Sequence, residues 1–511
     1  MLTAQTLAQW ALDLRADQVP ADVLQRARLQ QLSCAGALRA AAGLPLAKAL
    51  ATAAPRGKFP VIGRGKKSSQ RAALRAHATL LGALDYGDSL LWVSSSTAAC
   101  TAAWALAGEH SAAELDLAIV AANEVSGRIG LAGMLAPSSG PAWLSTQAAA
   151  AAIVAGRLNG LAAGELAHAL ALALGCVAKG LSPTMAARGL ATAAAVQAGL
   201  DAVDLAQGGA QGDLELLDRE QGFYGAHGCQ TPLRTAFAGL GQAWLTHTLS
   251  LKLRPGSLFS ATATDALVEI LGRHVRAADK RLRPDQWTDC RVRCAWPTWA
   301  MQSAAATGLP GLTWNLPSLF GVLGKGHEIG AEQLTHDWWQ EELPAIEQIA
   351  STVRVEHHWA YTLQAGQALI EQLGPLFSEL SISDLQAAFA RIGAGGPKMA
   401  SPVSKSELMA LVKSRPSGLL GLMKRPQGDL STIDLQAFRF TLPVDLRLST
   451  TRGGFWPETR IVPEGGAGES LEQLSTRAEN KFAAGSSEHA ERAAKARTFS
   501  GTGQEFLALL A

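Results

Sequence analysis

Residues 71–97 of this 511-residue chain read RAALRAHATLLGALDYGDSLLWVSSST and bear most directly on the fold. Apolar residues recur at helical spacing through the first half of the stretch, which predicts an amphipathic helix. Asp85 and then a row of small hydroxyl side chains follow the apolar run. A carboxylate at the carboxyl end of a helix opposes the helix dipole, so we expect Asp85 to have a cationic partner. That partner makes Asp85 either a structural ion pair or part of a site.

The composition of the whole chain indicates a protein that handles small molecules. Its length favours two domains, and 48% hydrophobic against 17% charged residues permits a large core. Forty-five basic residues balance 43 acidic ones, giving a formal charge of +2. This balance offers no electrostatic case for nucleic acid or an anionic membrane as partner. We therefore expect a small-molecule ligand.

Cysteine usage and the N-terminal sequence favour a cytoplasmic location. The cysteines are too sparse for a disulfide framework in a chain of this length. No basic leader with an apolar run opens the chain, and no window reaches about 18 uninterrupted apolar residues. Cys290 and Cys294 lie in TDCRVRCAW, but no second Cys/His pair follows at zinc spacing, so we expect no metal. The cysteines are Cys34, Cys100, Cys176, Cys229, Cys290 and Cys294.

The changes in composition and hydrophobic periodicity along the chain predict a helical domain that is interrupted by an α+β domain. Residues 1–252 are rich in Ala, Leu and Gly at helical spacing, which indicates tightly packed helices. After Pro255-Gly256, strand-like runs (TDCRVRCAW, STVRVEHHW, FRFTLPVDLRLST) alternate with helices, so residues 253–465 form the α+β part. Within it, residues 365–435 look like an insertion. Helical periodicity returns over 466–511, which we expect to complete the first domain.

Several segments resemble, in order, those of the MmgE/PrpD family, the 2-methylcitrate dehydratases and cis-aconitate decarboxylases. ALDYGDS resembles the family's A-L-D-F-x-D-T motif, and AAELDLAIVAANEVSGRIG its E-L-L-x-A-I-V-x-G-Y-E-V-x-x-R-I-G helix. NLPSLFGVLGKGHEIGAEQLT is similar to the family's S-L-P-Y segment and the turn after it, and SLEQLSTRAENKF to its final helix. The resemblance implies a mainly α fold: a large helical domain completed by the C-terminal helices, a smaller α+β lid domain, and a homodimer.

The resemblance also carries the family's site positions onto this chain. Asp85 matches the first aspartate of the motif, and Lys252 in LSLKLRPGS matches a family lysine. Arg188 falls where the family has the lysine of K-P-L-H. The resemblance thus implies catalytic roles for Asp85, Arg188 and Lys252. Other residues stand where the family has a threonine, imidazoles or a tyrosine, namely Ser89, Ser95, Leu144, Ser257 and Ser318, and the four serines are candidate substrate-binding residues.

These replacements change the chemistry that the site can perform. Dehydration of a tricarboxylate needs a base, cations that hold the developing charge, and an acid for the departing hydroxide. Histidine suits proton transfer because its ordinary pKa lies near the working pH, whereas a serine without a neighbouring base does not. The remaining carboxylate, two cations and hydroxyls can bind an anion, since Arg188 can grip a carboxylate through parallel hydrogen bonds.

We therefore expect a cofactor-independent lyase or isomerase that acts on a carboxylate-bearing small molecule between helical domain and lid. Elimination, double-bond isomerisation or cyclisation in specialised metabolite biosynthesis would suit the altered site. The alternative is an inactive family member that binds a metabolite or serves as a structural partner. Simpler interpretations of single residues also stay open: Asp85 as a structural ion pair, the Ser94–Thr97 run as a helix cap, and Trp314 as lid packing.

Overall fold

The computed structural model of this protein describes most of the chain. The exceptions are residues 109, 137–138, 177–183, 230, 301–308, 379, 382–426 and 452, and the side chains of 139–142 and 310. Most of the segment 365–435 that we interpret as an insertion therefore lies outside the described residues.

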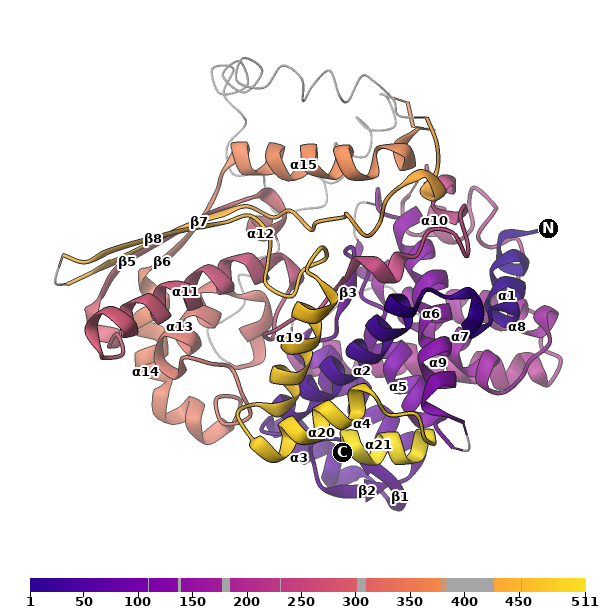
Figure 1. Cartoon of the computed structure of the whole chain (residues 1–511), viewed down its shortest axis with the longest axis horizontal. Helices are drawn as coiled ribbons and strands as arrows, with labels where there is room; N and C mark the ends of the chain where they lie inside the picture. Colours follow the sequence, from indigo (N-terminus) through magenta and orange to yellow (C-terminus); the bar gives the residue numbers. More distant parts are fainter. Residues whose placement is uncertain are drawn as a thin grey trace.

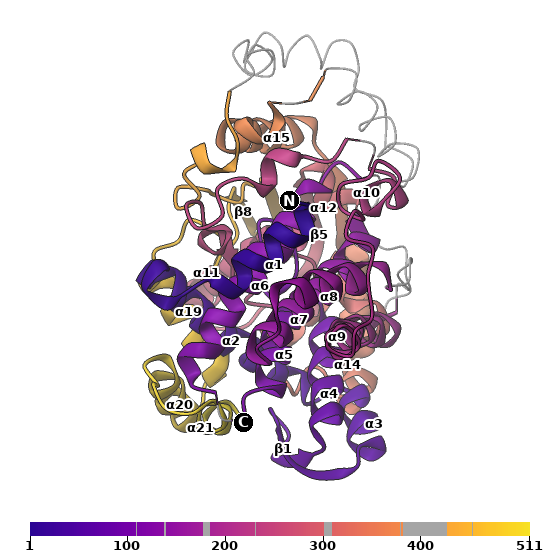
Figure 2. The ribbon, with the colours of Figure 1, turned by 90° about the vertical axis from the view of Figure 1, so that its right-hand side faces the viewer.

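Helices dominate the first part of the chain, as the sequence predicts, and pack side by side (Figures 1 and 2). Two short antiparallel ribbons accompany them, β1 with β2 and β3 with β4. None of the described helices has the length and apolar character needed to cross a bilayer. The helices are α1 (Thr3–Asp13), α2 (Ala21–Ala41), α3 (Pro45–Ala53), α4 (Gln70–Leu84), α5 (Ser96–Ala105), α6 (Ala112–Ala132), α7 (Ser139–Leu158), α8 (Ala163–Gly175), α9 (Met185–Gln207) and α10 (Phe223–Ala226), and the ribbon strands are β1 (Arg56–Val61), β2 (Lys66–Ser68), β3 (Ser89–Leu90) and β4 (Leu249–Ser250).

Small residues bring helix backbones together where α9 crosses its neighbours. A Cβ atom added at Gly189 would lie 2.3 Å from the backbone oxygen of Thr79 in α4. One added at Gly199 would lie 2.3 Å from the backbone oxygen of Ala148 in α7. Contacts this short are incompatible with any side chain, so glycine is required at both crossings. The tight packing predicted from the Ala- and Gly-rich composition is confirmed.

We expect Gly189→Ala to destabilise the protein by about 1–3 kcal/mol, because the added methyl group forces α4 and α9 apart. Gly164→Ala is the matched control, since Gly164 lies in helix α8 with nothing within 4 Å of its added Cβ. That control is expected to be neutral or slightly stabilising, because alanine favours helix. Urea unfolding of the two variants measures the difference, and equal stabilities would contradict the close-packing interpretation.

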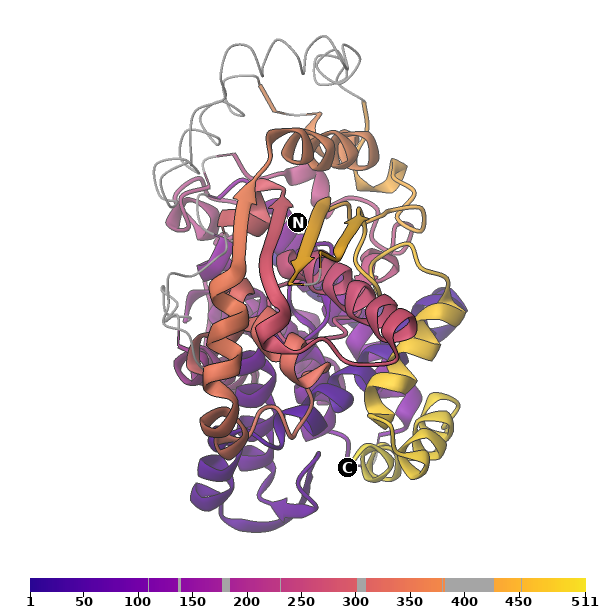
Figure 3. The same cartoon turned by 90° about the vertical axis from the view of Figure 1, so that its left-hand side faces the viewer.

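A four-stranded mixed sheet forms the centre of the second domain, in the order β6-β5-β7-β8 (Figure 3). Strands β5 and β6 are parallel, and β7 is antiparallel to both β5 and β8. The residues that alternate along β5, Cys290, Val292 and Cys294, are buried. Helices α11, α13 and α14 contact the sheet. The elements are β5 (Trp287–Cys294), β6 (Val353–His357), β7 (Val444–Thr450), β8 (Phe455–Arg460), α11 (Ala261–Ala278), α12 (Trp296–Ala300), α13 (Leu316–Gly326), α14 (His336–Thr352) and α15 (Trp359–Leu373).

The predicted strands in TDCRVRCAW and STVRVEHHW are confirmed as β5 and β6. The third prediction was wrong in its first half, because FRFTLP forms an irregular segment and β7 begins only at Val444. Pro443 has no N–H for a sheet hydrogen bond, which explains where the strand begins. Phe438, Phe440 and Leu442 are nonetheless buried, and the Leu442 N–H donates to the Ile461 carbonyl at 2.7 Å, so the alternation reflects packing beside the sheet and not a regular strand.

The three C-terminal helices return to the first part of the chain and appear in yellow in Figure 1. Helices α19 (Leu471–Ala483) and α20 (Ser487–Arg497) contact α2, and α21 (Gly503–Leu510) contacts α6. A Cβ atom added at Gly36 of α2 would lie 2.8 Å from the backbone oxygen of Lys481 in α19. The end of the chain thus packs on the N-terminal helices.

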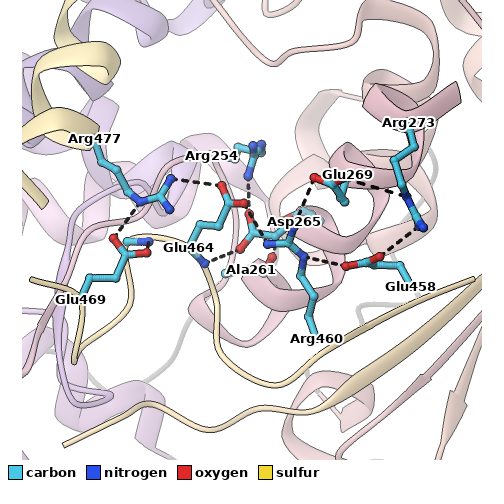
Figure 4. Close-up of polar contacts among 12 residues, drawn as sticks. Arg254, Ala261, Asp265, Glu269, Arg273, Glu458, Arg460, Glu464, Glu469 and Arg477 are labelled. Carbon is cyan, nitrogen blue, oxygen red and sulfur yellow. Dashed lines mark hydrogen bonds and ion pairs between the residues drawn. The ribbon is translucent and has the colours of Figure 1, made fainter. Parts of the chain in front are cut away.

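A network of ion pairs lies where α19, β8 and α11 meet (Figure 4). Glu464 accepts from Arg460 of β8 at 2.8 Å and from Arg477 of α19 at 3.3 Å. Its own backbone N–H donates to Asp265 of α11 at 2.7 Å, and Asp265 also pairs with Arg254. Arg254 follows Lys252 by two residues, so this network anchors the loop that carries the candidate lysine.

Candidate functional site

Helix α4 ends at Asp85 in a left-handed conformation. The hydroxyl of Ser69 accepts the Ala72 N–H at the start of the helix, and Asp85 has φ +47° at its end. The Tyr86 N–H donates to the Leu81 carbonyl at 3.1 Å, which completes a Schellman-type ending. A left-handed conformation is uncommon for residues other than glycine, although aspartate tolerates it better than most. The backbone therefore turns sharply and projects Asp85 away from the helix.

The segment that precedes Lys252 is held by a buried carboxylate. Glu124 of α6 accepts the backbone N–H groups of Leu245 and Thr246, both at 2.9 Å, and also pairs with Arg128. Strand β4 then pairs with β3, with Ser250 opposite Ser89. This pairing brings the chain two residues before Lys252 beside the chain four residues after Asp85.

Lys252 forms a direct ion pair with Asp85. Its Nζ lies 2.6 Å from Asp85 Oδ1 and 2.7 Å from the Asp85 carbonyl oxygen, and it also donates to the Gly256 carbonyl at 3.2 Å. The Lys252 side chain is 4% exposed and that of Asp85 18% exposed. The Gly256 N–H donates to the Leu84 carbonyl at 3.0 Å, so the loop after Lys252 is bound to the end of α4. Asp85 thus has the cationic partner that its position requires.

Arg188 of α9 reaches the same helix end from the other side. Its Nη2 donates to the Ala83 carbonyl at 2.8 Å and to the Thr313 hydroxyl, and its Nε approaches the Gly82 carbonyl at 3.4 Å. Both carbonyls belong to the last turn of α4, where the Gly82 carbonyl also accepts the Asp85 N–H at 3.2 Å, so the guanidinium caps the end of the helix. The guanidinium carbon also lies 4.8 Å from the ring centre of Trp314, whose Nε1 donates to Asp85 Oδ2 at 3.4 Å.

The electrostatics of the cluster favour a charged Asp85. Burial alone would raise the pKa of Asp85, but the charges of Lys252 and Arg188 and the hydrogen bonds from Lys252 and Trp314 hold this pKa below its ordinary value. Burial lowers the pKa of the Arg188 guanidinium, and the charge of Asp85 opposes that shift. Asp85, Arg188 and Lys252 therefore form one cluster, although they are far apart in the sequence.

The four candidate serines are buried, but no hydrogen bond joins their side chains to this cluster in the part of the chain that the structure describes. Ser89 lies in β3, and Ser257 accepts the Phe259 N–H at 3.3 Å while its own N–H donates to the Thr313 carbonyl at 3.2 Å. Ser95 is the N-cap residue of α5, yet its hydroxyl makes no capping hydrogen bond. The hydroxyls of Ser95 and Ser318 are buried without a hydrogen-bond partner among the described residues.

The three clustered side chains make no hydrogen bond or ion pair with a histidine among the described residues. His77, the histidine nearest to Asp85 in the sequence, accepts the Ile62 N–H at 2.9 Å and is fully buried, and burial lowers its pKa to about 3. It is a neutral core residue. Among the described residues, no group of three His, Cys, Asp or Glu side chains could hold a metal ion.

A cavity of about 10 Å³ adjoins the cluster, lined in part by Lys252, Ser257, Asp265 and Glu464. This volume has room for about one water molecule, far less than the roughly 300 Å³ of a small ligand site. A larger cavity, of about 380 Å³, lies near the His110, Glu114 and Arg157 side chains and contains none of the candidate residues. The chemistry of the Asp85 cluster, and not cavity size, therefore identifies the candidate site.

Sequence reasoning missed two residues of this cluster and its buried support. Thr313 contacts Arg188, and Trp314 contacts both Arg188 and Asp85, whereas the sequence alone favours core or lid packing for Trp314. Asp88 lies three residues after Asp85, is fully buried, and accepts the Lys252 N–H at 3.0 Å. Its position beside the motif aspartate was a signal that could have identified it, since a buried carboxylate requires partners.

Comparison with known proteins bears on the part of the chain that holds two of the three charged residues. Residues 5–235 match the family model described as the MmgE/PrpD N-terminal domain, a range that includes Asp85 and Arg188. No curated protein matches the chain. Lys252 lies outside the matched range, so its support comes from the resemblance of LSLKLRPGS to a family segment and from its ion pair with Asp85.

Proposed function

We propose, because this chain belongs to the MmgE/PrpD family, that it is a lyase or isomerase acting on a carboxylate-bearing small molecule at the Asp85, Arg188 and Lys252 cluster. The proposal rests on one observation, which concerns the Nη1 nitrogen of Arg188. Arg188 Nη1 is buried beside the Asp85–Lys252 pair and has no hydrogen-bond partner in the described structure. The reaction needs no cofactor in this proposal.

The unpartnered nitrogen of Arg188 supports anion binding. Nη2 and Nε hold the end of α4 and Thr313, so the plane of the guanidinium is fixed. Leaving a buried N–H of a charged group without an acceptor costs about 1–3 kcal/mol or more, and native proteins rarely tolerate it. A ligand carboxylate would supply the missing acceptor with a charge-assisted hydrogen bond.

The Lys252–Asp85 pair supports proton transfer as the second part of the proposal. The ammonium group can stabilise an enolate or protonate a leaving group, and the carboxylate can accept a proton from carbon. The lowered pKa of Asp85 makes its carboxylate a weak base. We therefore propose a substrate whose reacting C–H bond is activated by conjugation. Double-bond isomerisation of such a substrate suits a weak base better than the more difficult dehydration of a tricarboxylate.

The first test is whether the protein binds a small carboxylate ligand. Isothermal titration of the full chain with crotonate, itaconate and tricarballylate covers one, two and three carboxylates. We expect binding, with the Kd weakened about tenfold or more in Arg188→Lys, because lysine lacks the planar set of donors. Arg75→Lys, at an exposed position of α4, is the matched control and is expected to bind as the wild type does.

Turnover then separates an enzyme from a binding protein. We expect mass spectrometry to detect conversion of at least one unsaturated carboxylate from a wider panel, and conversion to be lost in a folded Lys252→Met variant. Binding without any conversion would support the alternative, a family member without catalysis that binds a metabolite. That alternative fits the Ser95 and Ser318 hydroxyls, which have no hydrogen-bond partner in the part of the chain that the structure describes. Absence of binding by all three acids would contradict the anion site.

The quaternary structure and the biological role belong to the same proposal. The family resemblance implies a homodimer, which light scattering of the purified chain would measure. A role in specialised biosynthesis follows from the altered site, since the groups that serve the common tricarboxylate substrates are replaced by Ser95, Leu144, Ser257 and Ser318.

A further inference from the structure

We propose that Lys481 of the C-terminal helix α19, acting with Asp88, is a positioning residue that fixes the backbone of Lys252 and thereby holds its ammonium group at Asp85. The inference rests on the proposed role of Lys252. Lys252 and Lys481 lie outside the range that matches the family's N-terminal domain, whereas Asp88 lies within it.

Two side chains hold the peptide groups on either side of the Lys252 Cα atom. The Lys252 N–H donates to Asp88 Oδ1 at 3.0 Å, and the Lys252 carbonyl accepts from Lys481 Nζ at 2.7 Å. Ser33 of α2 joins these two side chains, because its hydroxyl donates to Asp88 Oδ1 and accepts from Lys481 Nζ, both at 2.9 Å. Helix α2, the residues after α4 and helix α19 therefore converge on one residue.

Tyr86 extends this support to Leu253, the residue after Lys252. Lys481 Nζ lies 3.9 Å from the ring centre of Tyr86, and the Tyr86 hydroxyl donates to the Leu253 carbonyl at 2.6 Å. Three of the four polar groups of the Lys252–Leu253 backbone thus bind to side chains in place of a strand or helix partner. Side chains that satisfy a backbone in this way also determine where it lies.

The charged side chains of Lys481 and Asp88 are buried, and a buried charge destabilises the fold unless it is well paired. The Lys481 side chain is 4% exposed and Asp88 is fully buried, with 3.8 Å between Lys481 Nζ and Asp88 Oδ1. Burial raises the pKa of Asp88 and lowers that of Lys481, against their mutual attraction. A hydrophobic pair would fill such a position at lower cost, so the polar set is best explained by the backbone groups that it holds.

Fixing the backbone of Lys252 restricts its long side chain. Nζ is held by the Asp85 carboxylate and by the carbonyls of Asp85 and Gly256. With the backbone also held, both ends of the side chain are fixed, so the ammonium group is preorganised before a ligand arrives. This preorganisation removes side-chain entropy that would otherwise be lost during binding.

The experiment uses full-length protein that is labelled with ¹⁵N at the lysine side chains. Buried, hydrogen-bonded ammonium groups exchange protons with water slowly and give separate proton–nitrogen signals, and the Lys252 signal is assigned by its loss in Lys252→Met. In Lys481→Met we expect the Lys252 signal to shift and its proton exchange to accelerate about tenfold, which corresponds to about 1.4 kcal/mol. Lys481→Arg keeps a donor and is expected to restore part of the protection.

Lys495→Met is the matched control, because Lys495 is exposed on the neighbouring helix α20, and it should leave the Lys252 signal unchanged. An unchanged Lys252 signal in folded Lys481→Met would overturn the proposal. If Lys481→Met does not fold, Ser33→Ala removes the hydroxyl shared by Lys481 and Asp88; a shift in the same direction supports the proposal and no shift overturns it. Carboxylate binding is measured in a separate experiment, so the proton exchange of Lys252 can be interpreted even if the proposed function fails its test.

Discussion

Purified protein incubated with 2-methylcitrate or cis-aconitate is expected to leave both acids unchanged. The two reactions require positioned proton donors and acceptors, and this chain has Ser95, Leu144, Ser257 and Ser318 where the family resemblance expects imidazoles and a tyrosine. Each positioned general acid or base contributes a factor of about 10² to 10⁴. Two such losses at the lower value remove about 5 kcal/mol of transition-state stabilisation.

The structure strengthens this expectation. Within the described parts of the chain, the Ser95 and Ser318 hydroxyls have no hydrogen-bond partner that could act as a base, and the Ser257 hydroxyl accepts the Phe259 N–H as a helix cap. Groups that act as a unit lose activity less than multiplicatively, so the deficit in rate is smaller than the product of single losses. Chromatography with mass detection of both acids gives the measurement, with an active family enzyme assayed in parallel. Turnover near one per second on either acid would show that the assigned roles are wrong.

Lys252→Met should destabilise the folded protein by about 3 kcal/mol at neutral pH. Removing one partner of a buried ion pair leaves the other charge poorly compensated, and of the partners that the structure describes Asp85 then keeps Arg188 and Trp314. Lys325→Met is the matched control, because the Lys325–Glu342 pair lies at 2.9 Å but is partly exposed. Such exposed pairs contribute at most about 1 kcal/mol. Urea unfolding compares the two variants, and equal losses would contradict a buried, compensated Asp85.

The pH dependence of the same variant follows from Asp85. Its pKa in the folded protein is held below the ordinary value of 3.8, so the ion pair stabilises the fold above that value and the contribution is lost as the pH falls through the lowered pKa. The stability difference between wild type and Lys252→Met should therefore be largest near neutral pH and become smaller below about pH 4. A difference that stays constant into acid would indicate that Lys252 acts through packing alone.

Much of the fold could be predicted from the sequence because local patterns determine it. The helical period before Asp85 and the alternation in TDCRVRCAW predicted α4 and β5, and small residues predicted close helix packing. The same reasoning misplaced the start of β7, because alternating apolar residues also occur in a buried irregular segment. Periodicity reports which side chains are buried, whereas strand pairing depends on backbone groups such as the N–H that Pro443 lacks.

The candidate site was predictable only in part. Asp85, Arg188 and Lys252 were identified by the family resemblance, and the position of Asp85 at a helix end independently required a cation. Nothing in local sequence places Trp314 against Arg188, because that contact arises from packing of segments more than a hundred residues apart. The role of Lys481 was not predicted either, because a lysine on an amphipathic helix ordinarily lies on the solvated face.

A crystal structure of the wild-type protein with its tightest-binding carboxylate tests the central claim most directly. We expect a carboxylate oxygen about 2.7–3.1 Å from Arg188 Nη1, the nitrogen that has no partner among the described residues, with the ligand beside Lys252 Nζ. Arg188 Nη2 should remain bound to the end of α4. A carboxylate bound elsewhere, with Nη1 satisfied by a protein group or left empty, would contradict the account.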